Sequence, residues 1–394
     1  MRESILLDPA ELAESARFTA DGDLLLEQHL EKICIEVADG VSDIIPPDIL
    51  DGVLLGGGYG RGEGGVLRCS DGDRPYNDLE FYIFVKGSTL IAERRFRTEL
   101  SKLCHDLAPY AGLEVEFKIV SRRTLQRSET SMFFYDLACG HRRVLGGSDL
   151  LEGCGHLSRA DQIPLHEATR LLMNRCSGLL FSLERLHRTT FTGEDSDFVR
   201  RNCAKADLAL GDVVLAAYGS YHHSVRRRGE LLAKLPELPS LPRFEMLLQM
   251  HRRGVEFKLH PIQSGAPRSA LQARVNAILP VARDLFLWLE SRRLGVQFDS
   301  TEEYARSSAN KCPNTPGWRN FLVNMRAFGL SALREAPSRY PRRRLLETLP
   351  LLLWSPNVMR DHSLYAHLTS RLRKAPTNFA DAVSAYTELW HRFQ

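Results

Sequence analysis

The stretches DGVLLGGGYGRGEGG (residues 51–65) and NDLEFYIFV (residues 77–85) decide the fold of the first part of this chain. The first predicts a short apolar strand that runs into a glycine turn, and the second predicts a strand of aromatic and β-branched residues. A third strand is predicted for GLEVEFKIV (residues 112–120), where charged and apolar residues alternate. Leucine spacing predicts helices over residues 21–38 and 88–110. This order of elements predicts an α+β domain.

After about residue 155 the sequence has helical periodicity and few strand signals, which predicts an all-α part. We therefore expect one domain over residues 1–155 and a second, α-helical domain over residues 156–394, formed as one large domain or as two small bundles. The helices predicted for this part cover residues 165–187, 197–219, 243–254, 269–293, 317–328, 342–353 and 378–392.

The composition excludes several classes of protein. The chain has 394 residues with 52 Lys and Arg against 49 Asp and Glu, a net charge of +3, and so lacks the basic excess typical of nucleic-acid-binding proteins. Its eight cysteines lie apart without zinc-ligand spacing, which indicates a reduced, cytoplasmic protein. No secretory leader is predicted at residues 1–15, and the apolar runs are too short to span a membrane.

The glycine turn, which includes Gly57 and Gly58, predicts a backbone that takes positive φ and approaches a ligand closely. Successive amide N–H groups in such a turn bind phosphate oxygens, and a flexible loop without a ligand is the alternative. The Gly-Lys-Ser/Thr of a P-loop is absent. The run from Gly60 to Gly65 matches a dinucleotide-binding pattern, but turn-forming residues follow it where that pattern needs a helix.

Acidic residues lie on the two strands predicted after the glycine turn. Asp78 and Glu80 share one face of a strand because strand side chains alternate, and so do Glu114 and Glu116. If the strands are neighbours, three carboxylates meet in a set that Mg²⁺ or Mn²⁺ would neutralise and that suits phosphoryl transfer. For Asp78 and Glu80 alone, the alternative is the solubilising charge of an edge strand.

Together these residues resemble the DNA polymerase beta-type nucleotidyltransferase superfamily. Its signature is an apolar strand ending in Gly-Gly or Gly-Ser, an Arg-Gly-Glu continuation, a strand with Asp-x-Asp/Glu and a later strand with one acid. In this chain the places are filled by Leu55, Gly57, Gly58, the run from Tyr59 to Glu63, Asp78, Glu80 and Glu116. The resemblance covers about residues 50–150. It implies the small mixed sheet of a nucleotidyltransferase domain, with flanking helices.

The resemblance also implies the roles of these residues. Gly57 and Gly58 would contact the nucleotide phosphates, Asp78 and Glu80 would bind Mg²⁺ or Mn²⁺, and Glu116 would bind metal or act as a base. Two departures from the family pattern stand out. Nineteen residues, 59–77, separate the glycine pair from the first acid, which predicts an inserted hairpin. Glu116 is preferred as the third acid because FKIV after it completes the strand, and Glu114 is the alternative.

Three further residues are expected at the nucleotide. Tyr59 and Arg61 follow the glycine pair directly, and the guanidinium of Arg61 would touch phosphate or pair with Glu63. Lys205 lies on the helix predicted over residues 197–219, and superfamily members often supply a lysine from such a helix to the triphosphate. A solvated helix face is the alternative for Lys205.

The expected reaction transfers a nucleoside monophosphate from a nucleoside triphosphate to a hydroxyl and releases pyrophosphate, and ATP is the expected donor. The expected acceptor is a small molecule or a protein side chain, since no concentrated basic face favours nucleic acid, and no membrane partner is expected. Two alternatives stay open: nucleotide addition to an RNA or tRNA end, as in toxin-like transferases, and a non-catalytic nucleotide-binding regulatory protein.

Overall fold

Two compact units make up the chain, and each is described by itself. The structure is a computed structural model that describes residues 17–235, 241–263, 265–334 and 336–393. The first unit comprises Met1–Glu167, Leu215–Lys234 and Val255–Gln263, and the second comprises Ala168–Val214, Leu235–Gly254 and Ser264–Gln394. The predicted absence of a secretory leader concerns residues 1–15, which lie outside the described residues.

The first unit contains the strands. Four of them are hydrogen-bonded in the order β5-β4-β1-β6, and β2 and β3 form a separate pair. Because β4 is parallel to β5 while β1 is antiparallel to β4 and β6, the sheet is mixed, and the predicted α+β class is confirmed. The elements are α2 (Leu24–Ile44), β1 (Leu50–Leu55), α3 (Gly57–Gly60), β2 (Gly65–Cys69), β3 (Gly72–Tyr76), β4 (Leu79–Val85), α4 (Thr89–Ala111), β5 (Val115–Val120), α5 (Arg122–Gln126), α6 (Met132–Cys139), β6 (Arg142–Gly146), η1 (Gly155–Ser158), η2 (Ala160–Gln162) and α9 (Val225–Ala233).

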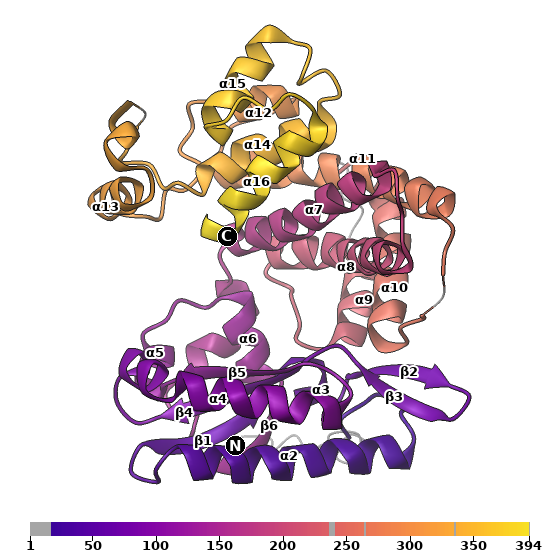
Figure 1. Ribbon diagram of the computed structural model, residues 1–394, viewed down its shortest axis with the longest axis vertical. Coiled ribbons are helices and arrows are strands. Elements are labelled where there is room, and N and C mark those ends of the chain that lie inside the picture. The colour runs from indigo at the N-terminus through magenta and orange to yellow at the C-terminus, as the bar shows by residue number, and fades with distance from the viewer. Residues whose placement is uncertain (1–16, 236–240, 264, 335, 394) are drawn as a thin grey trace, which may run out of the picture. The chain divides into compact units, whose positions relative to one another are not determined.

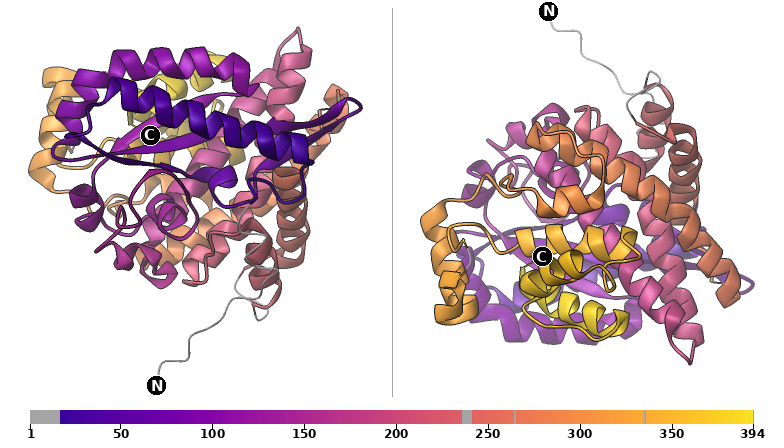
Figure 2. Two further views of the ribbon diagram at one scale, coloured as in Figure 1. Left: turned by 90° about the horizontal axis from the view of Figure 1, so that it is seen from below. Right: turned by 90° about the horizontal axis from the view of Figure 1, so that it is seen from above.

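Helices α2 and α4 pack together across one face of the four-stranded sheet (Figure 1 and Figure 2). The core beneath them joins their apolar side chains to alternate residues of the strands, including Leu79, Phe81 and Ile83 of β4. The intervening residues of β4, including Glu80 and Tyr82, lie on the opposite face by strand alternation. Helices α5 and α6 pack on part of that second face. One face of the sheet is therefore buried core, and the other carries the predicted acids.

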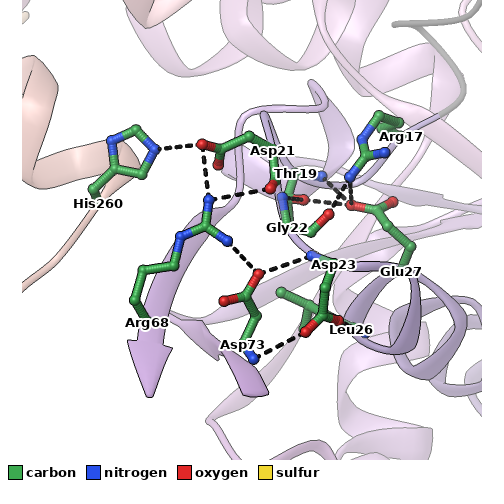
Figure 3. Close-up of polar contacts among 10 residues, drawn as sticks. All are labelled: Arg17, Thr19, Asp21, Gly22, Asp23, Leu26, Glu27, Arg68, Asp73 and His260. Carbon is green, nitrogen blue, oxygen red and sulfur yellow. Dashed lines mark hydrogen bonds and ion pairs between the residues drawn. The ribbon is translucent and has the colours of Figure 1, made fainter. Parts of the chain in front are cut away.

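The β2–β3 hairpin is the insertion that the long gap after the glycine turn predicted. Figure 3 shows the polar contacts that hold it to the start of α2. Arg68 of β2 lies 2.9 Å from Asp21 and also contacts Asp73, while Asp23 accepts a hydrogen bond of 3.1 Å from the Asp73 N–H. Nε2 of His260 lies 3.0 Å from the same Asp21 oxygen that Arg68 contacts. The hairpin is therefore anchored through both of its strands.

The described residues of the second unit form helices joined by loops, and none of them lies in a strand. Each of the seven helices predicted beyond residue 155 has a counterpart, and α7 and α13 begin and end at the predicted residues. The short α9, α12 and α15 were not predicted, because few turns give a weak periodic signal. The helices lying wholly or mainly in this unit are α7 (Leu165–His187), α8 (Gly193–Ala217), α10 (Phe244–Leu259), α11 (Arg268–Leu294), α12 (Thr301–Arg306), α13 (Gly317–Phe328), η3 (Gly329–Arg334), α14 (Arg343–Trp354), α15 (His362–Leu372) and α16 (Phe379–Phe393).

The compact units divide the chain differently from the predicted domains of residues 1–155 and 156–394. Residues 215–234 and 255–263, which the prediction placed with the helical part, belong to the first unit. Their long-range contacts give the reason, because Glu63 bonds the start of α9 and His260 bonds Asp21. Local periodicity carries no information about such contacts. Of the helices described, none combines the length and the apolar character that crossing a membrane requires.

Candidate active site

The predicted carboxylates lie on and beside two neighbouring strands. β4 and β5 pair in parallel, and Glu80 lies directly opposite Glu116. The prediction that these strands are neighbours is thereby confirmed, and Asp78 immediately precedes β4. The register also separates the two candidates for the third acid. Glu116 is the partner of Glu80 and is partly buried, whereas Glu114 precedes β5 and is exposed.

A lysine lies between the two paired carboxylates. Nζ of Lys118 is 3.2 Å from Oε2 of Glu80 and 3.4 Å from Oε2 of Glu116. The hydroxyl of Tyr82 donates a hydrogen bond of 2.7 Å to the same Glu80 oxygen. The ammonium also lies 5.6 Å from the ring centroid of Tyr82 and 5.2 Å from that of Phe133. Since like charges opposite each other on strands are destabilising, Lys118 serves as the counter-ion of this pair.

The surroundings of Glu80 favour its ionised form. Burial by itself would raise the pKa of Glu80, but the hydrogen bond from Tyr82 and the charge of Lys118 outweigh it and lower the pKa. Burial and the neighbouring Glu80 charge both raise the pKa of Tyr82, so its hydroxyl remains a donor. Neither Lys118 nor Tyr82 was predicted as a site residue, although strand alternation places them on the face of Glu116 and Glu80.

The glycine turn lies beside Glu80. Gly57 begins the short helix α3 with a φ of 62°, a conformation that favours glycine. A Cβ added at Gly57 would lie 3.7 Å from the carboxyl carbon of Glu80. The N–H of Gly56 donates a hydrogen bond of 2.8 Å to the carbonyl of Glu80, which ties the turn to β4. The first amides of a helix, here those of Gly57 and Gly58, have no acceptor within the helix, an arrangement that binds anions.

Tyr59 supports this turn from within the core. Its side chain is 1 % exposed, and its hydroxyl lies 3.0 Å from the Gly65 carbonyl and accepts a 2.7 Å hydrogen bond from the Tyr76 N–H. A Cβ at Gly64 would lie 2.1 Å from the Tyr59 ring, so only glycine fits there. The Tyr59 side chain thereby joins the turn to the hairpin, and the nucleotide contact of Tyr59 stays a prediction.

Arg61 and Glu63 each bind a distant segment of the first unit. The Arg61 side chain is 7 % exposed, and its Nη1 lies 3.4 Å from Oδ2 of Asp136 on α6. Glu63 accepts hydrogen bonds of 2.6 Å from Ser224 Oγ and 2.8 Å from the Val225 N–H, at the start of α9. The predicted pair of Arg61 with Glu63 is therefore not formed. Arg61 forms a largely buried ion pair with Asp136, and its phosphate contact stays a prediction.

Lys205 lies in the second unit, on α8, and its side chain is exposed. Two acids that follow it on this helix are buried and engaged elsewhere. Asp207 contacts Arg274, and Oδ1 of Asp212 lies 3.2 Å from Nε2 of His251. The assignment of Lys205 to the triphosphate stays a prediction.

The carboxylates have the oxygen ligands that Mg²⁺ and Mn²⁺ prefer, but they do not surround one point. No cluster of three or more Asp, Glu, His or Cys side chains in the described part of the chain is arranged to hold a metal ion. Glu80 and Glu116 both face the Lys118 ammonium instead. A divalent cation that binds these two acids must therefore displace that ammonium.

Comparison with known proteins assigns no family to the chain. No protein-family model matches it, and no curated protein matches it either. The chemistry of the site is therefore inferred from its geometry and from the motif resemblance of the sequence.

Proposed function

We propose that this chain is a Mg²⁺-dependent nucleotidyltransferase. It moves a nucleoside monophosphate from a nucleoside triphosphate, with ATP as the proposed donor, to a hydroxyl of a small molecule or a protein. The single observation that carries the proposal is the register pair of Glu80 and Glu116 beside the turn at Gly57. A carboxylate pair and an amide turn at one place supply ligands for a cation and donors for phosphate oxygens.

Each residue has a task in the proposed reaction. The amides of Gly57 and Gly58 donate to phosphate oxygens. Asp78, Glu80 and Glu116 would hold Mg²⁺ once the ion displaced the Lys118 ammonium and drew the three carboxylates together, and the bound ion would neutralise charge on the reacting phosphates.

Glu116 accepts the proton of the acceptor hydroxyl, because its side chain is 39 % exposed against 25 % for Glu80 and so is the more accessible base. The acceptor oxygen bonds to the α-phosphorus while the bond to the leaving pyrophosphate breaks.

A nucleotide-binding protein without turnover is the second candidate, and Lys118 is the observation that favours it. Its ammonium contacts both Glu80 and Glu116 and offsets one of their two negative charges. Such a site would hold a nucleotide through the turn amides and this lysine, and would lack the cation that the chemical step needs.

Incubation with α-labelled ATP and MgCl₂ tests the proposal. Pyrophosphate release supports an enzyme, and binding without release supports the second candidate. Labelled products in the small-molecule, protein or RNA fraction identify the acceptor, and label confined to RNA ends would favour the RNA-modifying alternative.

The variant Asp78→Asn is expected to slow release by at least about 100-fold, because it removes one of the charges that hold the metal. Asp106→Asn, at an exposed position of α4, is the matched control. Unchanged turnover by Asp78→Asn would rule out the mechanism.

A further inference from the structure

An apolar face of α13 is turned to solvent in the second unit. Trp318, Phe321 and Leu322 recur at three- and four-residue spacing and are 71 %, 39 % and 58 % exposed. This spacing places them on one side of the helix, the side that a globular protein normally buries. Single exposed leucines are ordinary, but an apolar helix face without cover marks an interaction site.

The opposite side of α13 is polar and buried. Asn320 and Asn324 are 2 % and 5 % exposed. Nδ2 of Asn320 donates to the Ser338 carbonyl at 2.9 Å, and Nδ2 of Asn324 donates to the carbonyls of Pro337 and Arg339 at 2.9 Å and 2.8 Å. Buried amides that bond fixed carbonyls set the rotation of the helix about its axis. The apolar side is thereby held outward.

Positive charge lies beside this apolar face. Arg319 and Arg326 are exposed and seven residues apart, so they lie two turns apart on the same flank of α13, which contains no Asp or Glu. Residues 311–344 contain eight Lys and Arg and one Glu, but Lys311, Arg343 and Arg344 are buried, so Arg319 and Arg326 are the charges that α13 itself exposes. Negative charge on a partner that covers α13 would complement these two arginines.

The element that follows extends the apolar surface. η3 packs against α13 and exposes Leu330 and Leu333, which are 78 % and 55 % exposed. Trp, Phe, Met and Arg are the residue types enriched at the centres of protein interfaces, and α13 carries all four. The composition of this surface is thus that of a protein-binding site.

We propose that α13 and η3 form a docking surface for an acidic amphipathic helix of another protein. An apolar stripe on the partner would cover the Trp318 face, and acids two turns apart would pair with Arg319 and Arg326. A second copy of this chain fits poorly, since arginines would face arginines. Nucleic acid would leave the exposed leucines without a role, and two exposed arginines are fewer than the roughly four to eight basic residues of anionic-lipid sites.

Two synthetic peptides test the docking surface by fluorescence anisotropy with the full chain. Both are amphipathic helices with the same leucine stripe, flanked at seven-residue spacing by glutamate in one and by lysine in the other. The glutamate peptide is expected to bind at least about tenfold more tightly than the lysine peptide. The double variant Arg319→Glu/Arg326→Glu is expected to reverse this preference, and Trp318→Ala/Phe321→Ala is expected to weaken both peptides by about tenfold.

The control is Arg94→Glu/Arg97→Glu, which reverses two exposed charges on α4 and should leave the peptide preference unchanged. Circular dichroism checks that the variants fold, and Arg319→Gln/Arg326→Gln, which should abolish the preference, replaces any charge-reversal variant that does not. Equal binding of the two peptides would overturn the proposal, as would a preference that the substitutions do not change. Tighter binding of a poly-dT oligonucleotide or of phosphatidylserine vesicles than of the glutamate peptide would overturn it as well.

Discussion

Lys118 gives the carboxylates of the candidate site a counter-ion from within the protein. Its ammonium contacts Glu80 and Glu116, while the Tyr82 hydroxyl donates to Glu80. Two facing acids without a cation would repel each other across the strand pair. A metal ion that binds these acids must displace the ammonium, so metal binding and the lysine contact compete for the same oxygens.

The variant Lys118→Met tests this competition. We expect its melting temperature in EDTA to fall by about 2–4 °C, because loss of a partly exposed ion pair costs about 1 kcal/mol. We also expect MgCl₂ to raise the melting temperature of the variant more than that of the parent, since no ammonium has to be displaced. Lys102→Met, at an exposed position of α4, is the control. An equal response of variant and parent to MgCl₂ would show that Lys118 does not compete with the cation.

Among the elements, α9 depends on a residue that is distant in sequence. Ser224 caps α9 locally by accepting a hydrogen bond of 3.3 Å from the Arg227 N–H. Glu63 adds a carboxylate that accepts from Ser224 Oγ and from the Val225 N–H. Negative charge at a helix N-terminus is stabilising, so Glu63 joins the glycine turn to α9.

The variant Glu63→Gln is expected to lower the free energy of unfolding by about 1–2 kcal/mol, because it removes the charge at the start of α9 and leaves one acceptor oxygen. Hydrogen exchange at the amides of residues 225–228 should become faster than in the parent. Glu230→Gln removes only the exposed contact with Arg227 and serves as the comparison. Parent-like exchange at these amides would mean that Glu63 does not hold the helix.

At the scale of the whole molecule, stability should depend on pH through His223. Burial, and then the nearby charges of His222 and Arg61, lower the pKa of His223 from 6.5 to about 4. The unfolded chain therefore binds the proton at His223 more readily than the folded chain does. The free energy of unfolding keeps its full His223 contribution above pH 6.5 and loses it as the pH falls toward 4. Asp207 acts in the opposite direction, since burial raises its pKa to about 6.

A comparison of the parent with His223→Gln isolates the histidine. The difference in their free energies of unfolding is expected to shrink by about 2 kcal/mol between pH 7 and pH 4, less than the full pKa difference implies because the ring is partly solvated. Urea titrations at several pH values measure it. His105→Gln, at an exposed position of α4, should follow the parent. If the free energies of unfolding of the parent and of His223→Gln change with pH in parallel, the pKa of His223 is not lowered by folding.

Much of the architecture could be predicted because it depends on neighbours along the chain. Strand alternation separated Glu80 from the core residues Leu79 and Phe81, and the excess length before Asp78 predicted the β2–β3 hairpin. Helical spacing located α7 and α13 to the residue. The short helices and the contacts of residues 215–234 with the first unit were not predictable in this way, because their stability comes from packing against distant segments.

The sequence by itself determined which side chains share a face and where the backbone needs glycine, because both follow from local geometry. Only the tertiary structure decided that Glu80 lies opposite Glu116, that Lys118 occupies the space between them, and that Arg61 and Glu63 bind separate distant segments. The physical reason is that strand register and long-range contacts are set by competition between alternative pairings. The pairing that buries the most apolar surface and satisfies the most polar groups prevails, and that outcome depends on the whole chain.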